Sequence, residues 1–304
     1  MFGAYMKTCS ADIIIAGGAN VDIKWRAMHK ILQGTTTITQ KNEHFGGVAR
    51  NIAEGLARLH MPCRFFSYVG HDENGRHMVE ELGRLGVDVS LVQFSKKYPT
   101  ATYCAVLHPS GELFASFIDS GIYDACGSNE LKIIQAAVNK NSLLVLDTDL
   151  SGEFLKGLLQ SGAQATWVSV TCVPAVEKIK PILGYIDVLF LNQQEFSVLC
   201  PAAGSIAQQC SWLHEQGLKN AVITLGAEGV ILSQEHQITT LPAHPVAALV
   251  DVTGAGDSLV AGTLYQYARG KSVHESLLFG IKAASLTIAS SESVSPIMHM
   301  LLES

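Results

Sequence analysis

The sequence has few features that would set the protein apart from an ordinary globular domain. Its seven cysteines include no CxxC pair and no Cys/His cluster with zinc-ligand spacing, which argues against a disulfide framework or a zinc module. No apolar run approaches the roughly eighteen residues that a membrane-spanning helix needs. Tandem repeats, low-complexity tracts and linkers rich in proline, glycine or serine are also missing. We therefore expect reduced, mostly buried thiols, a cytoplasmic location and no membrane partner.

Charge is sparse as well. Charged residues make up 16% of the chain, and the net charge of −6 is spread without a block of like charges or a basic stripe. A nucleic-acid partner is therefore not expected. Hydrophobic residues at 48% of 304 residues are enough for a well-filled core, which predicts one large domain with a small appendage.

Short apolar runs alternate with amphipathic helical patterns along the chain. Strands are expected at 13–16, 65–69, 143–147, 167–170, 188–191 and 222–225. Helices are expected between them, at 51–59, 77–86, 151–162 and 205–217. Near-continuous apolar strands separated by helices predict an α/β fold whose mostly parallel sheet is covered on both faces.

Two segments interrupt this alternation. Residues 35–42 and 100–119 show the period of strands with one polar face, and the second segment turns at 108–111. Strands of this kind, inserted between α/β units, predict a small sheet that stands off the main body as a lid. We place its strands at about 20–45 and 98–120.

Polar residues follow several of the expected strands. Asn20 and Asp22 follow the first strand, Asp147 and Asp149 follow the apolar run LLVL, and Asn192 follows VLFL. In open parallel sheets, ligands bind beyond the carboxyl ends of the strands. These residues are therefore expected to gather at one edge of the sheet.

The stretch DVTGAGDS, residues 251–258, places a glycine-rich turn directly before an apolar helical pattern. The helix is expected to begin near Ser258. The turn before it, Gly254, Ala255 and Gly256, leaves backbone amides unshielded, and such a turn attracts an anion. Asp257 beside it suits a general base that takes the proton of a hydroxyl while the amides hold a transferred phosphoryl group. The alternative is that Asp257 only caps the helix.

DVTGAGDS resembles the D-T-x-G-A-G-D signature of the ribokinase-like (PfkB) family of sugar and nucleoside kinases. HFGGVARNIA (44–53), LNQQEF (191–196) and TLGAEGV (224–230) are similar to further motifs of that family, and the resemblance covers nearly the whole chain. It implies a single kinase domain over residues 1–304, with a ribokinase-like three-layer α/β/α fold and a β-sheet lid. It also implies ATP as phosphoryl donor, Mg²⁺ as its companion, and a homodimer formed through paired lids.

The resemblance also assigns roles to residues. The catalytic group comprises Gly254, Ala255, Gly256 and Asp257. The substrate-binding group comprises Asn20, Asp22, Gly46, Gly47, Arg50 and Asn51, joined by Thr102 and Asp119 of the expected lid strands. Two alternatives stand beside the second group: a glycine pair before a helix also suits a tight turn, and exposed polar residues on a lid are often only solvated.

Nucleotide and metal positions follow in the same way. Asn192 and Glu195 are implied to hold hydrated Mg²⁺, although Asn followed three residues later by Glu also fits a capping box. Asp251 is implied to hold a monovalent cation such as K⁺, or else initiates a turn. The implied nucleotide wall consists of Thr224, Gly226, Gly229, Ala283, Ala284 and Thr287. For these, a hairpin turn and ordinary helix core are the alternatives.

GGVARNIA and GGANVD look most like the pseudouridine kinases of the family, which phosphorylate the 5′-hydroxyl of that C-nucleoside. Three interpretations remain open: such a kinase, a kinase for another sugar, nucleoside or sugar acid, and a nucleotide-binding regulator without catalysis. Asp257 argues against the regulator, whereas Ser169, where many relatives carry Asp, leaves room for it. A Rossmann dehydrogenase is disfavoured because AGGANVD lacks G-x-G-x-x-G.

Overall fold

The computed structural model describes residues 12–200, 204–246 and 248–303. Its largest element is an eight-stranded sheet in the order β14-β13-β12-β11-β10-β9-β1-β4. Strands from β4 to β12 pair in parallel, and β13 and β14 extend the edge as an antiparallel hairpin. The bounds are β1 (Asp12–Ala16), β4 (Arg64–Phe66), β9 (Ser142–Asp147), β10 (Ala165–Ser169), β11 (Val188–Asn192), β12 (Asn220–Thr224), β13 (Val230–Gln234) and β14 (Gln237–Leu241).

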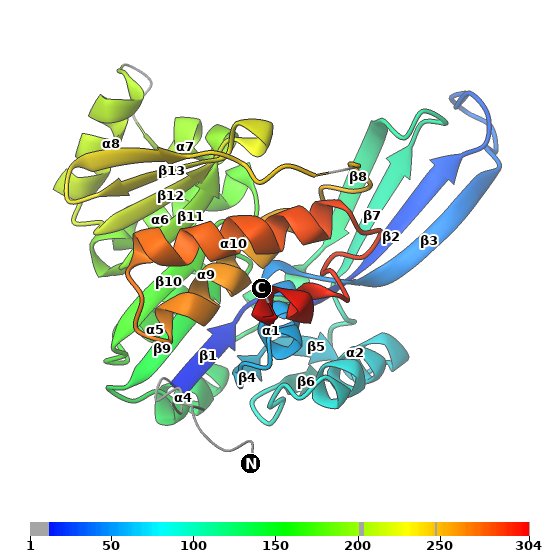
Figure 1. The fold of residues 1–304 in the computed structure, drawn as a ribbon. Helices are drawn as coiled ribbons and strands as arrows, with labels where there is room; N and C mark the ends of the chain where they lie inside the picture. The colour runs from blue at the N-terminus through cyan, green and yellow to red at the C-terminus, as the bar shows by residue number, and fades with distance from the viewer. Residues whose placement is uncertain (1–11, 201–203, 247, 304) are drawn as a thin grey trace, which may run out of the picture.

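Helices cover both faces of this sheet (Figure 1). In β1, Ile13 and Ile15 pack into one core with α1, α2, α9 and α10, whereas Ile14 and Ala16 face the opposite core with α4 to α8. Because successive side chains of a strand point to opposite faces, a run of apolar residues supplies both cores. The helices are α1 (Val48–Arg58), α2 (Glu73–Arg84), α3 (Gly121–Asp124), α4 (Ser128–Ala137), α5 (Gly152–Leu159), α6 (Val176–Ile179), α7 (Gln193–Leu199), α8 (Ile206–Glu215), α9 (Ala255–Tyr267) and α10 (Val273–Ile288). This is the three-layer α/β/α fold.

A four-stranded sheet in the order β3-β2-β7-β8, called here the small sheet, extends away from the main body (Figure 1). Its strands are β2 (Asn20–Ala27), β3 (Thr39–Gly46), β7 (Thr102–Leu107) and β8 (Leu113–Asp119). The edge strand β8 exposes large apolar side chains, among them Phe117 at 65% and Ile118 at 59% of their surface. The small sheet therefore carries an apolar edge that no described residue covers.

Two expected strands differ from the observed ones. The run 65–69 is divided between β4 and β5 (Tyr68–Gly70), and β5 pairs with β6 (Gln93–Ser95) in a separate two-stranded sheet. The division falls at Ser67, whose buried hydroxyl donates to the carbonyl of Gly17 at 2.7 Å. The strand expected at 35–42 begins only at Thr39 and continues to Gly46, because its pairing with β2 extends over that whole length.

Six of the seven cysteines lie in the described ranges. All six described cysteines are free thiols, and four of them are buried. Burial raises the pKa of the Cys63 and Cys200 thiols to about 12, so both are protonated at neutral pH. Within the described ranges, no helix combines the length and the apolar character needed to cross a membrane.

Candidate active site

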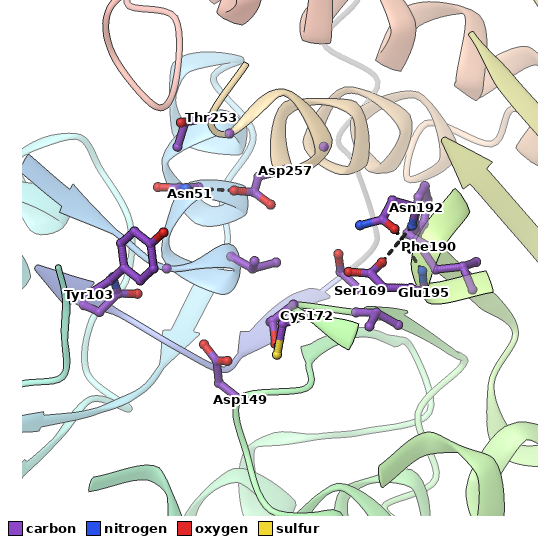
Figure 2. A pocket seen from close by; sticks show the side chains of 18 of the residues that line it. Asn51, Tyr103, Asp149, Ser169, Cys172, Phe190, Asn192, Glu195, Thr253 and Asp257 are labelled. Carbon is purple, nitrogen blue, oxygen red and sulfur yellow. Dashed lines mark hydrogen bonds between the residues drawn. The ribbon is translucent and has the colours of Figure 1, made fainter. Parts of the chain in front are cut away.

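A cavity of about 740 Å³ lies between the carboxyl ends of the main-sheet strands and the small sheet (Figure 2). Its walls come from the residues after β1, β9, β10 and β11, from the first turns of α1 and α9, and from β7 and β8. The sequence-predicted residues that line it are Asn20, Asp22, Gly47, Asn51, Asn192, Glu195, Thr224, Gly254, Gly256 and Asp257. Motifs from distant parts of the chain thus meet in one place.

Asp257 lies in the first turn of α9, which begins at Ala255, before the start near Ser258 that the sequence suggested. Its Oδ2 accepts a hydrogen bond of 2.7 Å from Nδ2 of Asn51, on α1 (Figure 2). The N-cap residue Gly254 has no side-chain cap, so the partner of Asp257 is another element and not the end of its own helix. This geometry favours the acid–base interpretation over helix capping.

The surroundings of Asp257 shift its pKa toward neutrality. Burial is the largest cause, the hydrogen bond from Asn51 opposes it, and the nearby charges of Asp22 and Asp149 raise the pKa further, to about 7. A general base is most effective when its pKa lies near the working pH. Asp257 is therefore suited to receive a proton from a bound hydroxyl.

The turn before α9 depends on one glycine in particular. Gly254 has a φ of 75°, and a Cβ at this position would collide with the carbonyl of Ser293. Gly256 lines the cavity, and no atom lies within 4 Å of the position its Cβ would take. Because the first amides of a helix have no intrahelical partner, this open turn is suited to bind an anion. Ala255 does not line the cavity, and its amide donates to the carbonyl of Val252 at 3.3 Å.

Asn20 and Asp22 point into the cavity from the start of β2. Nδ2 of Asn20 donates to Oδ1 of Asp22, and Gly46, opposite Asn20 on β3, has no side chain to collide with that carboxylate. Burial raises the pKa of Asp22, against the opposing charge of His44. Gly46 thus makes room for Asp22 and does not itself line the cavity.

Two buried residues that the sequence gave no specific role fix the loop after β1. Asp147 accepts hydrogen bonds from the amides of Gly18 at 2.8 Å and Ala49 at 2.9 Å, which joins that loop to the start of α1. The hydroxyl of Tyr123 accepts from the amide of Ala19 and donates to its carbonyl, each at 2.8 Å. Burial raises the pKa of Asp147 well above its ordinary value.

The structure corrects the expected role of Arg50. Its side chain is buried outside the cavity, where it pairs with Glu54 at 2.5 Å and Glu81 at 2.9 Å. Nη1 also donates to Oδ1 of Asn51 at 3.1 Å, which leaves Nδ2 of Asn51 directed at Asp257. Arg50 therefore contacts the cavity residue Asn51 through its amide oxygen and does not itself line the cavity.

Thr102 and Asp119 are also corrected. They lie opposite each other in the pairing of β7 with β8, and neither lines the cavity. The next pair, Tyr103 and Ile118, does line it. Since side chains alternate between the two faces of a strand, Thr102 and Asp119 lie on the face that points away.

On the opposite side of the cavity, Asn192 and Glu195 form the capping box of α7. Oδ1 of Asn192 accepts from the amide of Glu195 at 2.9 Å, and Oε2 of Glu195 accepts from the amide of Asn192 at 2.7 Å (Figure 2). Both residues also line the cavity, and burial raises the pKa of Glu195. The capping box and a position beside a ligand are thus compatible.

The expected nucleotide wall is only partly present. Thr224 lines the cavity, whereas Gly226 and Gly229 form the turn between β12 and β13 outside it. The structure corrects the expected place of two residues of α10 in this wall, Ala283 and Thr287. Both side chains are fully buried against α9. Thr287 Oγ1 lies 2.7 Å from the hydroxyl of Ser258, and Ala284 packs partly buried against the same core.

The charged side chains among the described lining residues of the cavity are all acidic. Four carboxyl groups line it, those of Asp22, Asp149, Glu195 and Asp257, and none of its described lining residues is Lys, Arg or His. Asp149 was predicted to lie at this edge of the sheet, but its place in the site was not predicted; burial raises its pKa. A polyphosphate would be repelled here unless a cation accompanied it.

Residues 12–299 match the model of the pfkB family of carbohydrate kinases, and the chain belongs to this family. It is 26% identical over 282 residues to pseudouridine kinase from Escherichia coli (strain K12), covering 91% of this chain and 90% of that one. It is 28% identical over 264 residues to ribokinase from Haemophilus influenzae, covering 83% and 84% of the two chains.

Among solved structures, ribokinase from Arabidopsis thaliana in complex with ribose and ATP has a TM-score of 0.81 at 25% identity, covering 97% of this chain and 99% of that one. The family and the three-layer fold expected from the motifs are thereby confirmed. The protein is a kinase of the pfkB carbohydrate kinase family.

Proposed function

We propose that this kinase transfers the terminal phosphoryl group of ATP to the 5′-hydroxyl of a nucleoside, with pseudouridine as the preferred acceptor. The observation that carries the nucleoside assignment is the apolar surface of the small sheet inside the cavity, formed by the cross-strand pair Tyr103 and Ile118. An aromatic ring stacks on a nucleobase, whatever the base, because every base has a π-face, and a free sugar has none. The likeness to pseudouridine kinase and the Arg-containing motif GGVARNIA support pseudouridine among the nucleosides.

The acidic lining of the cavity also bears on the charge of the acceptor. Four carboxyl groups and the absence of a basic side chain among the described lining residues disfavour an anionic acceptor. A sugar acid is therefore the poorest of the acceptors that the sequence left open. Neutral nucleosides and neutral sugars fit the same electrostatics.

In the proposed reaction, Asp22, Gly47 and Asn51 orient the acceptor, and the carboxylate of Asp257 takes the hydroxyl proton. The hydroxyl oxygen forms a bond to the terminal phosphorus as the bond between that phosphorus and the bridging oxygen of ADP breaks. The amides of Gly254 and Gly256 hold the charge on the transferred group, and protonated Asp257 then returns its proton to solvent.

The donor set fits Mg²⁺, which typically keeps several waters and needs only one or two carboxylates. Glu195 uses Oε2 in its capping box, which leaves Oε1 for a magnesium-bound water, and Asp149 supplies a second carboxyl group in the same cavity. Asn192, the capping-box partner of Glu195, lines the same cavity. When bound with ATP, the ion neutralises phosphate charge that this cavity cannot neutralise with its own side chains. Ser169 also lines the cavity and contributes no carboxylate.

We further propose that residues 1–304 form one kinase domain in which the small sheet acts as a lid, and that two lids pair to form a homodimer. The exposed apolar side chains of β8 and its free strand edge support this pairing. The use of ATP supports the cytoplasmic location expected from the cysteines. Sedimentation at micromolar concentration should show a dimer, and Phe117→Asp should convert it to a monomer; a monomeric wild-type protein would contradict the pairing.

A panel of acceptors tests the function. ATP-dependent phosphorylation is measured with pseudouridine, uridine, adenosine, ribose and fructose at equal concentrations, with the Asp257→Asn protein as the control for contaminating kinases. We expect the highest kcat/KM for pseudouridine and lower values for the free sugars. A preference for ribose or fructose would contradict the nucleoside assignment, and nucleotide binding without turnover of any acceptor would support the regulator.

A further inference from the structure

Lys24 joins the small sheet to the turn that precedes the anion-binding helix start. Its Nζ lies 2.7 Å from Oδ2 of Asp251 and 3.1 Å from Oγ1 of Thr253. The other carboxylate oxygen of Asp251 accepts from the amide of Thr253 at 2.9 Å and from its hydroxyl at 2.7 Å. The side chains of Lys24 and Asp251 are only 21% and 31% exposed, so water screens the pair less than it would on an open surface.

The contact between Lys24 and Asp251 lies next to the residues of the proposed phosphoryl transfer. Thr253 and Gly254 line the cavity, and α9 with Asp257 begins directly after them. Asp251 is held to the end of α10 by its amide, which donates to the carbonyl of Ile288 at 3.3 Å. The ammonium group of Lys24 thus fixes the turn from the side of the small sheet, while α10 fixes it from the other side.

The monovalent cation that the family resemblance implies at Asp251 does not fit this arrangement. Both oxygens of the carboxylate already have partners, and one of those partners is itself a cation. Burial raises the pKa of Asp251, but the hydrogen bond and charge of Lys24 and the two hydrogen bonds from Thr253 together outweigh it. The net shift lowers the pKa, so Asp251 stays ionised and paired. A second monocation at these oxygens would meet the charge of the ammonium group at close range. Among the described residues, no group of three or more His, Cys, Asp or Glu side chains is placed to hold a metal ion.

We propose that Lys24 is a positioning residue whose ammonium group serves as the built-in cation of the Asp251–Thr253 turn, so that phosphoryl transfer needs no monovalent metal ion. The inference rests on the proposed kinase function. It has a second consequence, because Lys24 belongs to β2 of the small sheet: the anion-binding turn is fully ordered only when the small sheet is in place over the cavity.

The test compares wild type, Lys24→Met and Lys24→Arg in buffers of equal ionic strength that contain choline, Na⁺ or K⁺ as the only monovalent cation. We expect the wild-type kcat/KM to change by less than about twofold among the three salts. In choline, Lys24→Met should lose about tenfold or more, because a hydrogen bond to a charged group is removed next to the anion site. Potassium should restore part of that loss, and Lys24→Arg should stay independent of the salt.

Lys41→Met is the matched control, because Lys41 lies on the neighbouring strand of the same sheet and pairs with Glu43 instead of the turn. It should behave like wild type in every salt. A readout that does not depend on turnover is the melting temperature: K⁺ at a saturating concentration should raise that of Lys24→Met above its value in choline, and should leave wild type unchanged. This comparison holds even if no acceptor is phosphorylated, so the two proposals fail separately.

Activation of the wild type by K⁺ of about tenfold or more over choline would overturn the inference, since the ammonium group would then not fill the role. Full activity of Lys24→Met in choline would overturn it as well. If Lys24→Met does not fold, Lys24→Gln removes the charge of the ammonium group and keeps a hydrogen-bond donor toward Asp251. That variant should show the same salt dependence to a smaller extent, and an absence of salt dependence would contradict the proposal.

Discussion

Replacing Asp257 by Asn should stabilise the folded protein while it abolishes phosphoryl transfer. The pKa of Asp257 is raised from 3.8 to about 7 in the folded state. Below pH 4 the carboxyl group is protonated in both states and carries no penalty. As the pH rises from about 4 to 7, the unfolded chain releases the proton and the folded protein retains it, so stability falls with pH and then levels off.

The size of the effect follows from the shift. One pKa unit corresponds to about 1.36 kcal/mol, so a shift from 3.8 to about 7 gives an upper value of about 4 kcal/mol above pH 7. The side chain is partly exposed to the cavity, and water there reduces the penalty. We therefore expect Asp257→Asn to raise the free energy of unfolding by about 2 kcal/mol at pH 8 and by almost nothing near pH 4. Asn keeps an oxygen that can accept the hydrogen bond from Asn51.

Urea unfolding at pH 8, 6 and 4.5 measures this difference. Asp72→Asn is the matched control with the opposite sign, because Asp72 caps α2 and hydrogen bonds from Gly75 and Thr100 lower its pKa despite partial burial. Relative to wild type, Asp72→Asn should be less stable at pH 8, and this difference in the free energy of unfolding should shrink toward low pH. An Asp257→Asn protein that is no more stable than wild type at pH 8 would refute the raised pKa of the carboxyl group at this position.

Three further predictions concern residues around the cavity. Arg50→Met should lower the free energy of unfolding by about 3 kcal/mol, because it leaves the buried Glu54 without its buried partner. Arg58→Met removes the more exposed partner of the same glutamate and should cost less than about 1 kcal/mol. Equal losses in urea unfolding would contradict this. Gly254→Ala should cost at least about 1 kcal/mol in urea unfolding and abolish turnover, because its Cβ would meet Ser293 and φ is positive; a stable, active variant would show that the turn is not fixed. Tyr103→Ala should raise KM for the nucleoside about tenfold and leave that for ribose nearly unchanged, as steady-state kinetics would show; equal effects on both would argue against base stacking.

The sequence predicted those parts of the site that local pattern controls. A glycine-rich turn before a helix and polar residues after buried strands are visible in the chain itself, and they placed Asp257, Asp22 and Asn192 correctly in one cavity. The main sheet followed from apolar runs in the same way. The errors at β4 and β5 arose where a tertiary contact, that of Ser67 with Gly17, ended a strand within the expected strand 65–69.

What could not be predicted depends on which way a side chain faces. The strand period shows that Thr102 and Tyr103 point to opposite faces, but it does not show which face borders the cavity. Similarly, the spacing on α10 does not tell a cavity wall from the contact with α9 that buries Thr287. The pairing of Lys24 with Asp251 joins residues 227 positions apart, and no local pattern indicates it.

Nucleotide binding and single-turnover phosphoryl transfer, measured on Asp257→Asn beside wild type, test most directly whether Asp257 receives the proton while the amides of the turn hold the phosphate. The rate of transfer to pseudouridine should fall by at least about a hundredfold, and the dissociation constant for the Mg²⁺ complex of ATP should change by no more than a few-fold. A transfer rate within a few-fold of wild type would exclude Asp257 as the base.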